Sequence, residues 1–343
     1  TWLTRPRAVS EDTRRRFKRF NPGAHLHIGV FDDGLAHLSR VEALRWCADR
    51  DIRHIEMGVG GWKQADHLDL DALLREAGER DRLTGELRDH GIELVCVNAA
   101  GNPLHPDPAV GARHASLLRG AVELAALLGC DRVVTMSGCP GDRNGGSTPV
   151  FASWPVIPDD ETLWEWQLEN QLAPFWRELS SWTADVAPGV MICLELHAGA
   201  SAYNPASFAR LREATGPNVG VNLDPSHFWW QGMDPVAVIE QVGTAIGFAH
   251  GKDTLVHPDR VRRNGLLDLG FPVNADTASW HFSAVGTGHD DDTWTALVQA
   301  LRAAGYDGVI SIEHEDPRMT PEQGVETSLA TLRRACERVE AAA

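Results

Sequence analysis

Eight short apolar runs alternate with helix-period segments along this 343-residue chain, and this alternation constrains the fold more than any other feature. Most of the runs are continuously apolar, as expected for parallel strands that are buried on both faces. Eight strand–helix units in one chain predict a single (β/α)8 TIM barrel, whose usual size is about 250 residues. A doubly wound open sheet is the main alternative, but no GxGxxG sequence follows the first run. The runs span residues 24–30, 51–58, 91–99, 131–138, 189–196, 219–224, 245–251 and 308–315.

The segments between these runs show helical periodicity and recognisable helix ends. Residues 292–305 repeat apolar side chains at i, i+3, i+4 and i+7, which places them on one face of a helix. The helix predicted over 108–129 ends at a glycine. The last helix opens with 320-TPEQ-323, where Thr320 and Gln323 can form a capping box. This succession of helix and strand supports βα repeats.

The length beyond a minimal barrel falls mainly after the fourth and seventh strands, in residues 139–160 and 252–290. Both segments follow strands, so we expect them to be long βα loops on the C-terminal face, where barrel enzymes carry their active sites. We predict an N-terminal arm over residues 1–23 and a single catalytic barrel domain over 24–343. The basic run 14–19 in the arm is interpreted as solvated, with docking of a partner subunit as the alternative.

Composition excludes several classes of partner. The chain has 48 acidic and 32 basic residues, a net charge of −16, which repels nucleic acid and anionic membranes. Six cysteines without CxxC spacing predict neither a disulfide framework nor a structural zinc site. No apolar run approaches the roughly 18 residues of a membrane span, and the N-terminus lacks a signal-peptide pattern. We therefore expect a reduced, soluble, cytoplasmic protein that binds neither nucleic acid nor membrane.

Ionisable residues stand where several predicted strands end, and in a barrel these positions converge on one mouth. A carboxylate in an apolar run is costly unless a positive charge stands opposite it. Three carboxylates and one imidazole from consecutive strands suit one divalent ion such as Mn²⁺, Mg²⁺, Co²⁺ or Zn²⁺, with a structural ion-pair network as the alternative. The four candidate metal ligands are Glu195, Asp224, His250 and Glu313.

The order of these residues resembles the xylose-isomerase-like superfamily, and within it the sugar isomerase/epimerase branch that includes D-tagatose 3-epimerase and inosose dehydratase. The resemblance runs from about residue 24 to residue 335. It implies that the same four residues bind the metal, for which we expect Mn²⁺ first, and that Glu195 and Glu313 also form the catalytic acid/base pair. The epimerases have a substrate-binding arginine after the strand-seven histidine, and the spacing of the arginines here differs. The resemblance is carried by 193-CLELH-197, 222-NLDPSH-227, 249-AHGKD-253 and 311-SIEHE-315.

Further residues near the strand ends are candidates for substrate binding. The resemblance implies that His227 lies against substrate oxygens, and Lys252 near the mouth can stabilise a developing oxyanion, with a solvated loop lysine as the alternative. Glu56, His197 and Trp230 complete the predicted set. The chain has twelve tryptophans and only two tyrosines, and tryptophans in mouth loops can either stack on a sugar or anchor the loops. Those in predicted mouth loops are Trp62, Trp154, Trp229, Trp230 and Trp280.

The leading hypothesis for function is a metal-dependent isomerase or epimerase acting on a ketose or keto-sugar. A carboxylate removes the proton next to a metal-polarised carbonyl, and the resulting enediolate is reprotonated from the other face in an epimerase or at the adjacent carbon in an isomerase. The alternative is a lyase on the same barrel, either an inosose-type dehydratase or a keto-glycoside-cleaving enzyme. Leu194 stands where the related deglycosidases have a catalytic histidine, which argues against the second version.

Two other functional classes are disfavoured. A nuclease of the endonuclease IV type needs a basic DNA-facing surface, which the net charge of −16 opposes. A non-catalytic sugar-binding protein has little need for two glutamates flanking a metal. The partner we expect is a small-molecule sugar or glycoside, and the resemblance also allows a homo-oligomer.

Overall fold

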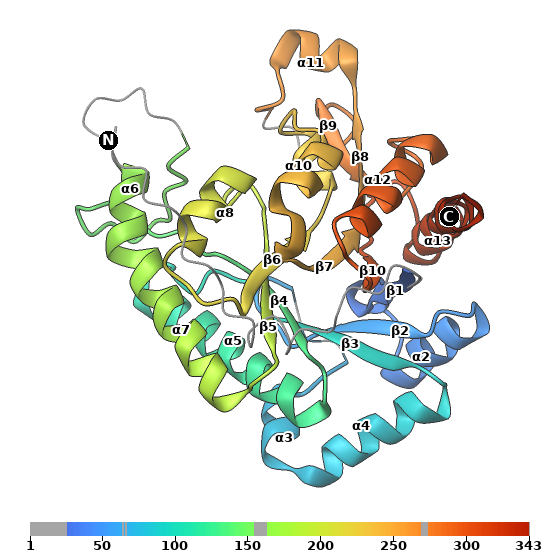
Figure 1. Ribbon diagram of the computed structural model, residues 1–343, viewed down its shortest axis with the longest axis horizontal. Helices are drawn as coiled ribbons and strands as arrows, with labels where there is room; N and C mark the ends of the chain where they lie inside the picture. Colours follow the sequence, from blue (N-terminus) through green and yellow to red (C-terminus); the bar gives the residue numbers. More distant parts are fainter. Residues whose placement is uncertain (1–25, 64, 66, 154–162, 269–273, 343) are drawn as a thin grey trace.

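Eight parallel strands form a closed barrel surrounded by helices in the computed structural model of the chain (Figure 1). The structure describes all residues except 1–25, 64, 66, 154–162, 269–273 and 343. The predicted N-terminal arm and Trp154 lie outside the described residues. The (β/α)8 TIM barrel predicted from the alternation of apolar runs and helical segments is confirmed.

Each barrel strand overlaps one of the eight predicted runs. Neighbouring strands pair in parallel, and β10 pairs with both β1 and β7, which closes the barrel. The strands are β1 (His27–Phe31), β2 (His54–Gly58), β3 (Glu93–Asn98), β4 (Arg132–Met136), β5 (Met191–Glu195), β6 (Val219–Leu223), β7 (Ile246–Gly251) and β10 (Val309–Ile312).

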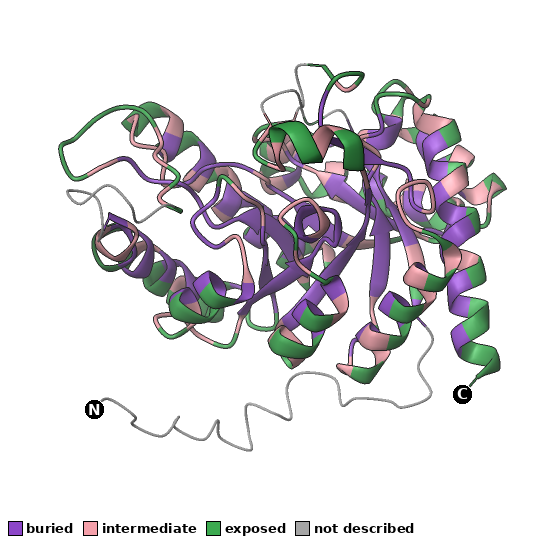
Figure 2. Cartoon of the chain, turned by 90° about the horizontal axis from the view of Figure 1, so that it is seen from above, coloured by how far each residue is buried: buried purple, intermediate pink, exposed green. Residues whose placement is uncertain are grey.

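The helices form an outer layer that exposes its outward faces, whereas the strands are buried at the centre (Figure 2). The predicted helix ends are present: Gly129 has φ 73° after α5, and Thr320 and Gln323 form the capping box of α13. None of the helices that the structure describes has the length and apolar character of a membrane span. The α-helices are α2 (Arg40–Asp49), α3 (Leu70–Arg75), α4 (Ala77–Asp89), α5 (Pro108–Leu128), α6 (Leu163–Gln167), α7 (Ala173–Val186), α8 (Pro205–Arg212), α9 (Ser226–Trp229), α10 (Pro235–Val242), α11 (Pro258–Asn264), α12 (Asp291–Ala303) and α13 (Pro321–Ala341).

The segment between β7 and α12 contains a substructure that the sequence did not reveal. Strands β8 (Asp253–Val256) and β9 (Trp280–Ser283) pair antiparallel, and α11 lies between them in the chain (Figure 1). Asp253 anchors the part of this segment that leads from β9 to α12. Its carboxylate accepts hydrogen bonds from the backbone N–H groups of Gly286, Gly288 and His289. The stretch expected to be one long loop therefore includes an ordered two-stranded ribbon.

Alternate residues of the barrel strands face the interior, and their character changes along the barrel axis. A separate cluster of buried side chains, which we call the apolar layer, fills one part of it. In β5, Met191 and Cys193 belong to this layer, whereas Glu195, two residues further on, lies at the C-terminal mouth. The apolar layer consists of Cys96, Val134, Met191, Cys193, Phe248 and Val309.

Candidate metal centre and substrate cavity

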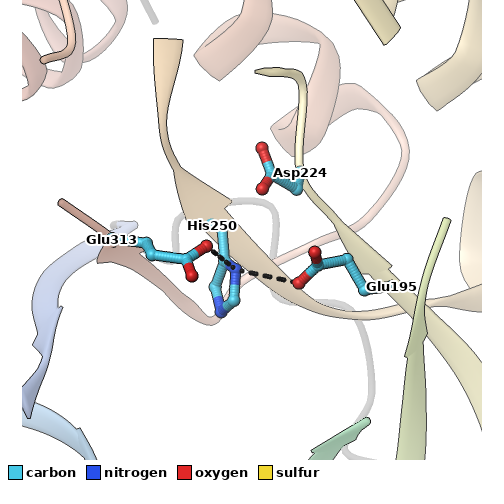
Figure 3. A group of neighbouring side chains, drawn as sticks. All are labelled: Glu195, Asp224, His250 and Glu313. Carbon is cyan, nitrogen blue, oxygen red and sulfur yellow. Dashed lines mark ion pairs between the residues drawn. The ribbon is translucent and has the colours of Figure 1, made fainter. Parts of the chain in front are cut away.

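Four ionisable side chains from neighbouring strands meet inside the barrel mouth (Figure 3). Glu195 is the last residue of β5 and His250 lies in β7, whereas Asp224 and Glu313 directly follow β6 and β10. All four are buried, and one potential ligand atom from each lies within 4.8 Å of the others. The structure thus brings together the four residues predicted as metal ligands, which we call the tetrad.

The orientation of His250 is set from behind by Glu56. His250 Nε2 lies 3.0 Å from Glu56 Oε2, and Glu56 also accepts a hydrogen bond of 2.8 Å from Asn98 Nδ2. His250 Nδ1 lies 3.3 Å from an oxygen of Glu195 and 3.2 Å from an oxygen of Glu313, which approach it from opposite sides (Figure 3). A carboxylate that fixes the second nitrogen of a histidine is the usual support of a metal ligand. Glu56 thus contacts His250, and it is not among the described residues that line the cavity at the mouth.

The electrostatics favour ionised tetrad carboxylates. Burial opposes ionisation of Glu195, but hydrogen bonds with His227 and His250 hold its pKa well below the ordinary value. Burial likewise opposes ionisation of Glu313, and the charges of Lys252 and Lys63 bring the pKa of that carboxyl well below its usual range. For His250, burial favours the neutral ring, but the charge of Glu56 and further carboxylate contacts raise its pKa well above normal. The carboxylates are therefore ionised, and their charge is compensated by Lys252, Lys63 and the two histidines.

The residues present fit a divalent ion. Asp224 Oδ2 is buried and lies 2.9 Å from Lys252 Nζ and 3.2 Å from His227 Nε2, but it makes no well-oriented hydrogen bond with any described residue. Such a buried, incompletely satisfied oxygen beside two other carboxylates and an imidazole nitrogen suits a cation. Carboxylate oxygens with one imidazole are donors that Mn²⁺, Mg²⁺, Co²⁺ and Zn²⁺ accept.

A cavity of about 100 Å³ opens beside the tetrad and is lined by two kinds of wall. The apolar surface comes from the β1 to β4 side and includes Trp62, which is 53% exposed, although Asp33 and Lys63 also line this side. Residues at and just after the ends of β5, β7 and β10 provide charged surface. The apolar surface includes Phe31, Trp62, Ala100 and Met136; the charged surface includes Glu195, Lys252, Glu313 and Glu315, with the His197 ring beside it.

The predicted substrate-binding residues divide between this cavity and its surroundings. His197 and Lys252 line it. His227 is buried next to His197, with 4.1 Å between the ring centroids, and its Nε2 lies 2.9 Å from Glu195 Oε1. Burial favours the neutral ring of His227, but the charge of Asp224 and hydrogen bonds with Asp224 and Glu195 raise its pKa to about 9. Trp230 stacks on Trp280 of the ribbon, with 4.5 Å between the rings, and is not among the described lining residues.

The lining residues that the sequence analysis did not predict include three charged side chains that are joined by ion pairs. Asp33 follows β1, Lys63 lies in the loop after β2, and Glu315 follows Glu313 by two positions. No local pattern distinguishes them from ordinary loop residues. One signal was available for Lys63: the chain has only three lysines against 29 arginines, and Lys63 and Lys252 both line this cavity.

Residues 44–335 match the family model described as xylose isomerase-like TIM barrel. The chain belongs to the xylose isomerase-like TIM barrel family. The protein YfiH of Bacillus subtilis (strain 168) is 35% identical over 312 residues, which are 90% of this chain and 98% of YfiH.

Solved structures of low sequence identity share the fold. The IolI protein with a bound zinc atom has a TM-score of 0.62 and 19% identity, covering 92% of this chain and 99% of its own. The probable 3-DHS dehydratase AsbF from Bacillus anthracis has a TM-score of 0.62 and 16% identity, covering 89% and 99%. A D-tagatose 3-epimerase-like protein has a TM-score of 0.60 and 20% identity, covering 92% and 100%.

Proposed function

We propose that this protein is a divalent-metal-dependent sugar isomerase or epimerase that acts on a ketose or keto-sugar through an enediolate. One observation carries the proposal: the two glutamates of the buried tetrad both line the cavity and flank the same imidazole nitrogen. The family membership and the epimerase-like neighbour support it. We propose Mn²⁺ as the ion, with Mg²⁺, Co²⁺ or Zn²⁺ as alternatives.

The residues of the mouth supply the groups that such a reaction needs. A divalent ion held by the tetrad would polarise the substrate carbonyl and so acidify the neighbouring C–H group. Glu195 and Glu313 are placed for proton transfer: one carboxylate accepts the proton from carbon, and the other carboxyl group returns a proton to the enediolate. His227 orients Glu195 through the 2.9 Å contact, and Lys252 Nζ, 2.7 Å from Glu313, provides positive charge for a developing oxyanion.

A lyase on the same barrel is the second candidate, and Asp33 is the observation that favours it. This residue lines the cavity, and its buried Oδ1 has no hydrogen-bond partner among the described residues. Burial raises the pKa of Asp33 to about 7, although Lys63 opposes the shift. A carboxyl group that holds its proton near neutral pH can protonate a departing hydroxyl group, which elimination of water requires. The neighbour AsbF is described as a probable dehydratase.

Elemental analysis and proton exchange test the proposal together. We expect about one divalent ion per wild-type chain, and loss of the ion in Asp224→Ala. Ketoses, keto-sugars and cyclic polyhydroxy ketones are then incubated with the protein in D₂O and followed by NMR. Deuterium at the carbon next to the carbonyl with a new isomer supports the isomerase or epimerase, whereas an unsaturated product supports the lyase. A protein that takes up no divalent ion under any loading condition would contradict both.

A further inference from the structure

Lys63 joins three carboxylates at the rim of the cavity. Its Nζ lies 2.8 Å from Glu313 Oε1 and 3.1 Å from Glu315 Oε1, and it also contacts Asp33. The three acidic residues come from the segments that follow β1 and β10, whereas Lys63 comes from the loop after β2. An ammonium group has three N–H donors, so each carboxylate can receive one of them.

Lys252 contacts the remaining oxygens of the same two glutamates. Its Nζ lies 2.7 Å from Glu313 Oε2 and 3.1 Å from Glu315 Oε2. Each glutamate therefore gives one oxygen to Lys63 and the other to Lys252. We call this closed arrangement of Lys63, Lys252, Glu313 and Glu315 the lysine–glutamate ring.

The scarcity of lysine in this chain indicates that the ring requires ammonium groups. Arginine supplies the cation in ion pairs elsewhere, such as Arg40–Glu86 and Arg334–Asp291. Two of the three lysines of the chain nevertheless belong to the ring. A planar guanidinium suits a single carboxylate approached edge-on, whereas carboxylates that converge on one point from different directions need a compact tetrahedral donor.

Charge compensation alone does not explain the position of Lys63. Its own side chain is 37% exposed, but the side chains of Glu313 and Asp33 are only 7% and 12% exposed, so the pairs compensate buried carboxylates. Lys252 already supplies a positive charge 2.7 Å from Glu313 Oε2. Lys63 adds a donor at the other oxygen, Oε1, which lies 2.8 Å from its Nζ.

We propose that Lys63 is a positioning residue that fixes the carboxylate plane of Glu313 at the edge of the cavity. Lys252 and His250 both contact Glu313 Oε2, whereas Lys63 contacts Oε1 and so limits rotation of the carboxylate about Oε2. The inference rests on the proposed function, in which Glu313 is both a metal ligand and one of the two proton-transfer groups. Lys63 acts through Glu313 and need not contact the substrate.

The decisive variant is Lys63→Arg, because it keeps the charge and changes only the donor geometry. We expect the rate of deuterium exchange into the substrate to fall on the order of 10²-fold with KM changed by less than about threefold, since misplacement of a reacting group by about 1 Å has that effect. We also expect the Mn²⁺ affinity, measured by calorimetry, to fall roughly tenfold, as it does when a partner that orients a ligand is altered. Arg119→Lys, in a surface pair with Glu178, is the matched control and should change neither quantity.

Chemical rescue separates an ammonium requirement from a folding defect. Lys63→Cys is treated with 2-bromoethylamine, whose bromide is displaced by the introduced thiolate to give a side chain of nearly lysine shape that ends in an ammonium group. We expect recovery of exchange to within about tenfold of wild type, and no recovery after iodoacetamide, which adds a neutral amide. The six native cysteines are buried, and burial raises the pKa of thiols such as Cys47 and Cys193 to about 12, so they should react slowly.

Each result decides a separate question. Lys63→Arg with wild-type exchange and wild-type Mn²⁺ affinity would overturn the positioning role, as would equal recovery with both alkylating reagents. A wild-type protein that binds Mn²⁺ but exchanges no substrate proton would contradict only the proposed reaction. The Mn²⁺ affinity of Lys63→Arg would then still test whether Lys63 positions Glu313. A wild-type protein that binds no divalent ion would overturn both.

Discussion

The apolar layer and the mouth are lined by the same strands but have opposite physical character. In β5, Cys193 lies in the apolar layer and Glu195 at the mouth, and in β7 the same change separates Phe248 from His250. One step of the strand's two-residue repeat thus replaces a sulfur or an aromatic ring with an ionisable side chain of the tetrad. Burial stabilises the first kind of residue and penalises the second.

This difference indicates that residues important for stability and residues important for chemistry lie at different levels along the barrel axis. Packing in the apolar layer can hold the strands in register without any ion or substrate. The mouth contains buried carboxylates that favour folding only when lysines, histidines or a metal compensate them. We therefore expect substitutions in the mouth to change chemistry and those in the apolar layer to change stability, and each of the following experiments tests that separation.

The largest effect is expected for Glu195→Gln in the mouth. The amide keeps the shape of the side chain but cannot accept a proton from carbon, so deuterium exchange should fall about 10²- to 10⁴-fold. The melting temperature should stay within a few degrees of wild type. NMR exchange and thermal unfolding are measured on the same preparation, with Glu178→Gln on the surface as the control. Exchange that survives the substitution would remove Glu195 from the acid/base pair.

The next effect is expected for Phe248→Ala in the apolar layer. Loss of a buried aromatic ring leaves a cavity and should lower the free energy of unfolding by about 3–5 kcal/mol, measured by urea titration. The Mn²⁺ affinity of the folded protein should change by less than threefold. Phe248 contacts His250 edge to face, with 5.9 Å between the ring centroids, so this variant is a demanding test. A large loss of metal affinity would show that the two layers are coupled.

The strands and the residues at their ends could be predicted from the sequence because each depends on a local signal. Continuous apolar runs identify strands buried on both faces, and a charged residue at the end of such a run is conspicuous. Glu195, Asp224, His250 and Glu313 were therefore found together once the barrel was assumed. Their convergence follows from strand order alone, since neighbouring strands bring their C-terminal ends to one mouth.

The parts that were missed depend on contacts between distant segments. Strands β8 and β9 are four residues each and lie 23 residues apart, so neither stabilises the other locally. Lys63 and Glu315 are 252 positions apart, and only the closed barrel places the loop after β2 beside the segment after β10. Glu56 was found as a strand-end residue, but its contact with His250 depends on side-chain direction across the barrel.

A smaller effect is expected for Glu56→Gln, at the border between the two layers. The amide can no longer hold the N–H of His250 through a charge, so the ring becomes less well oriented and less basic. We expect the Mn²⁺ affinity to fall about 10- to 100-fold, measured by calorimetry, with KM unchanged at saturating metal. A raised KM with unaltered metal affinity would instead support the sequence-based prediction that Glu56 binds substrate.

The smallest effects on activity are expected for substitutions of tryptophans at the mouth. These substitutions distinguish a tryptophan that stacks on the substrate from one that anchors a loop. Trp62 lines the cavity and is 53% exposed, so Trp62→Ala should raise KM about 2- to 10-fold, equivalent to about 0.5–1.5 kcal/mol of ring stacking, with little change in kcat. Trp230 stacks on Trp280, so Trp230→Phe should leave KM within twofold of wild type and lower the melting temperature slightly. Steady-state kinetics and thermal unfolding of both variants decide between the roles. If Trp230→Phe raises KM more than Trp62→Ala does, the substrate extends over the β8–β9 ribbon. The substrate-binding surface would then include Trp230 and Trp280 as well as the cavity beside the tetrad.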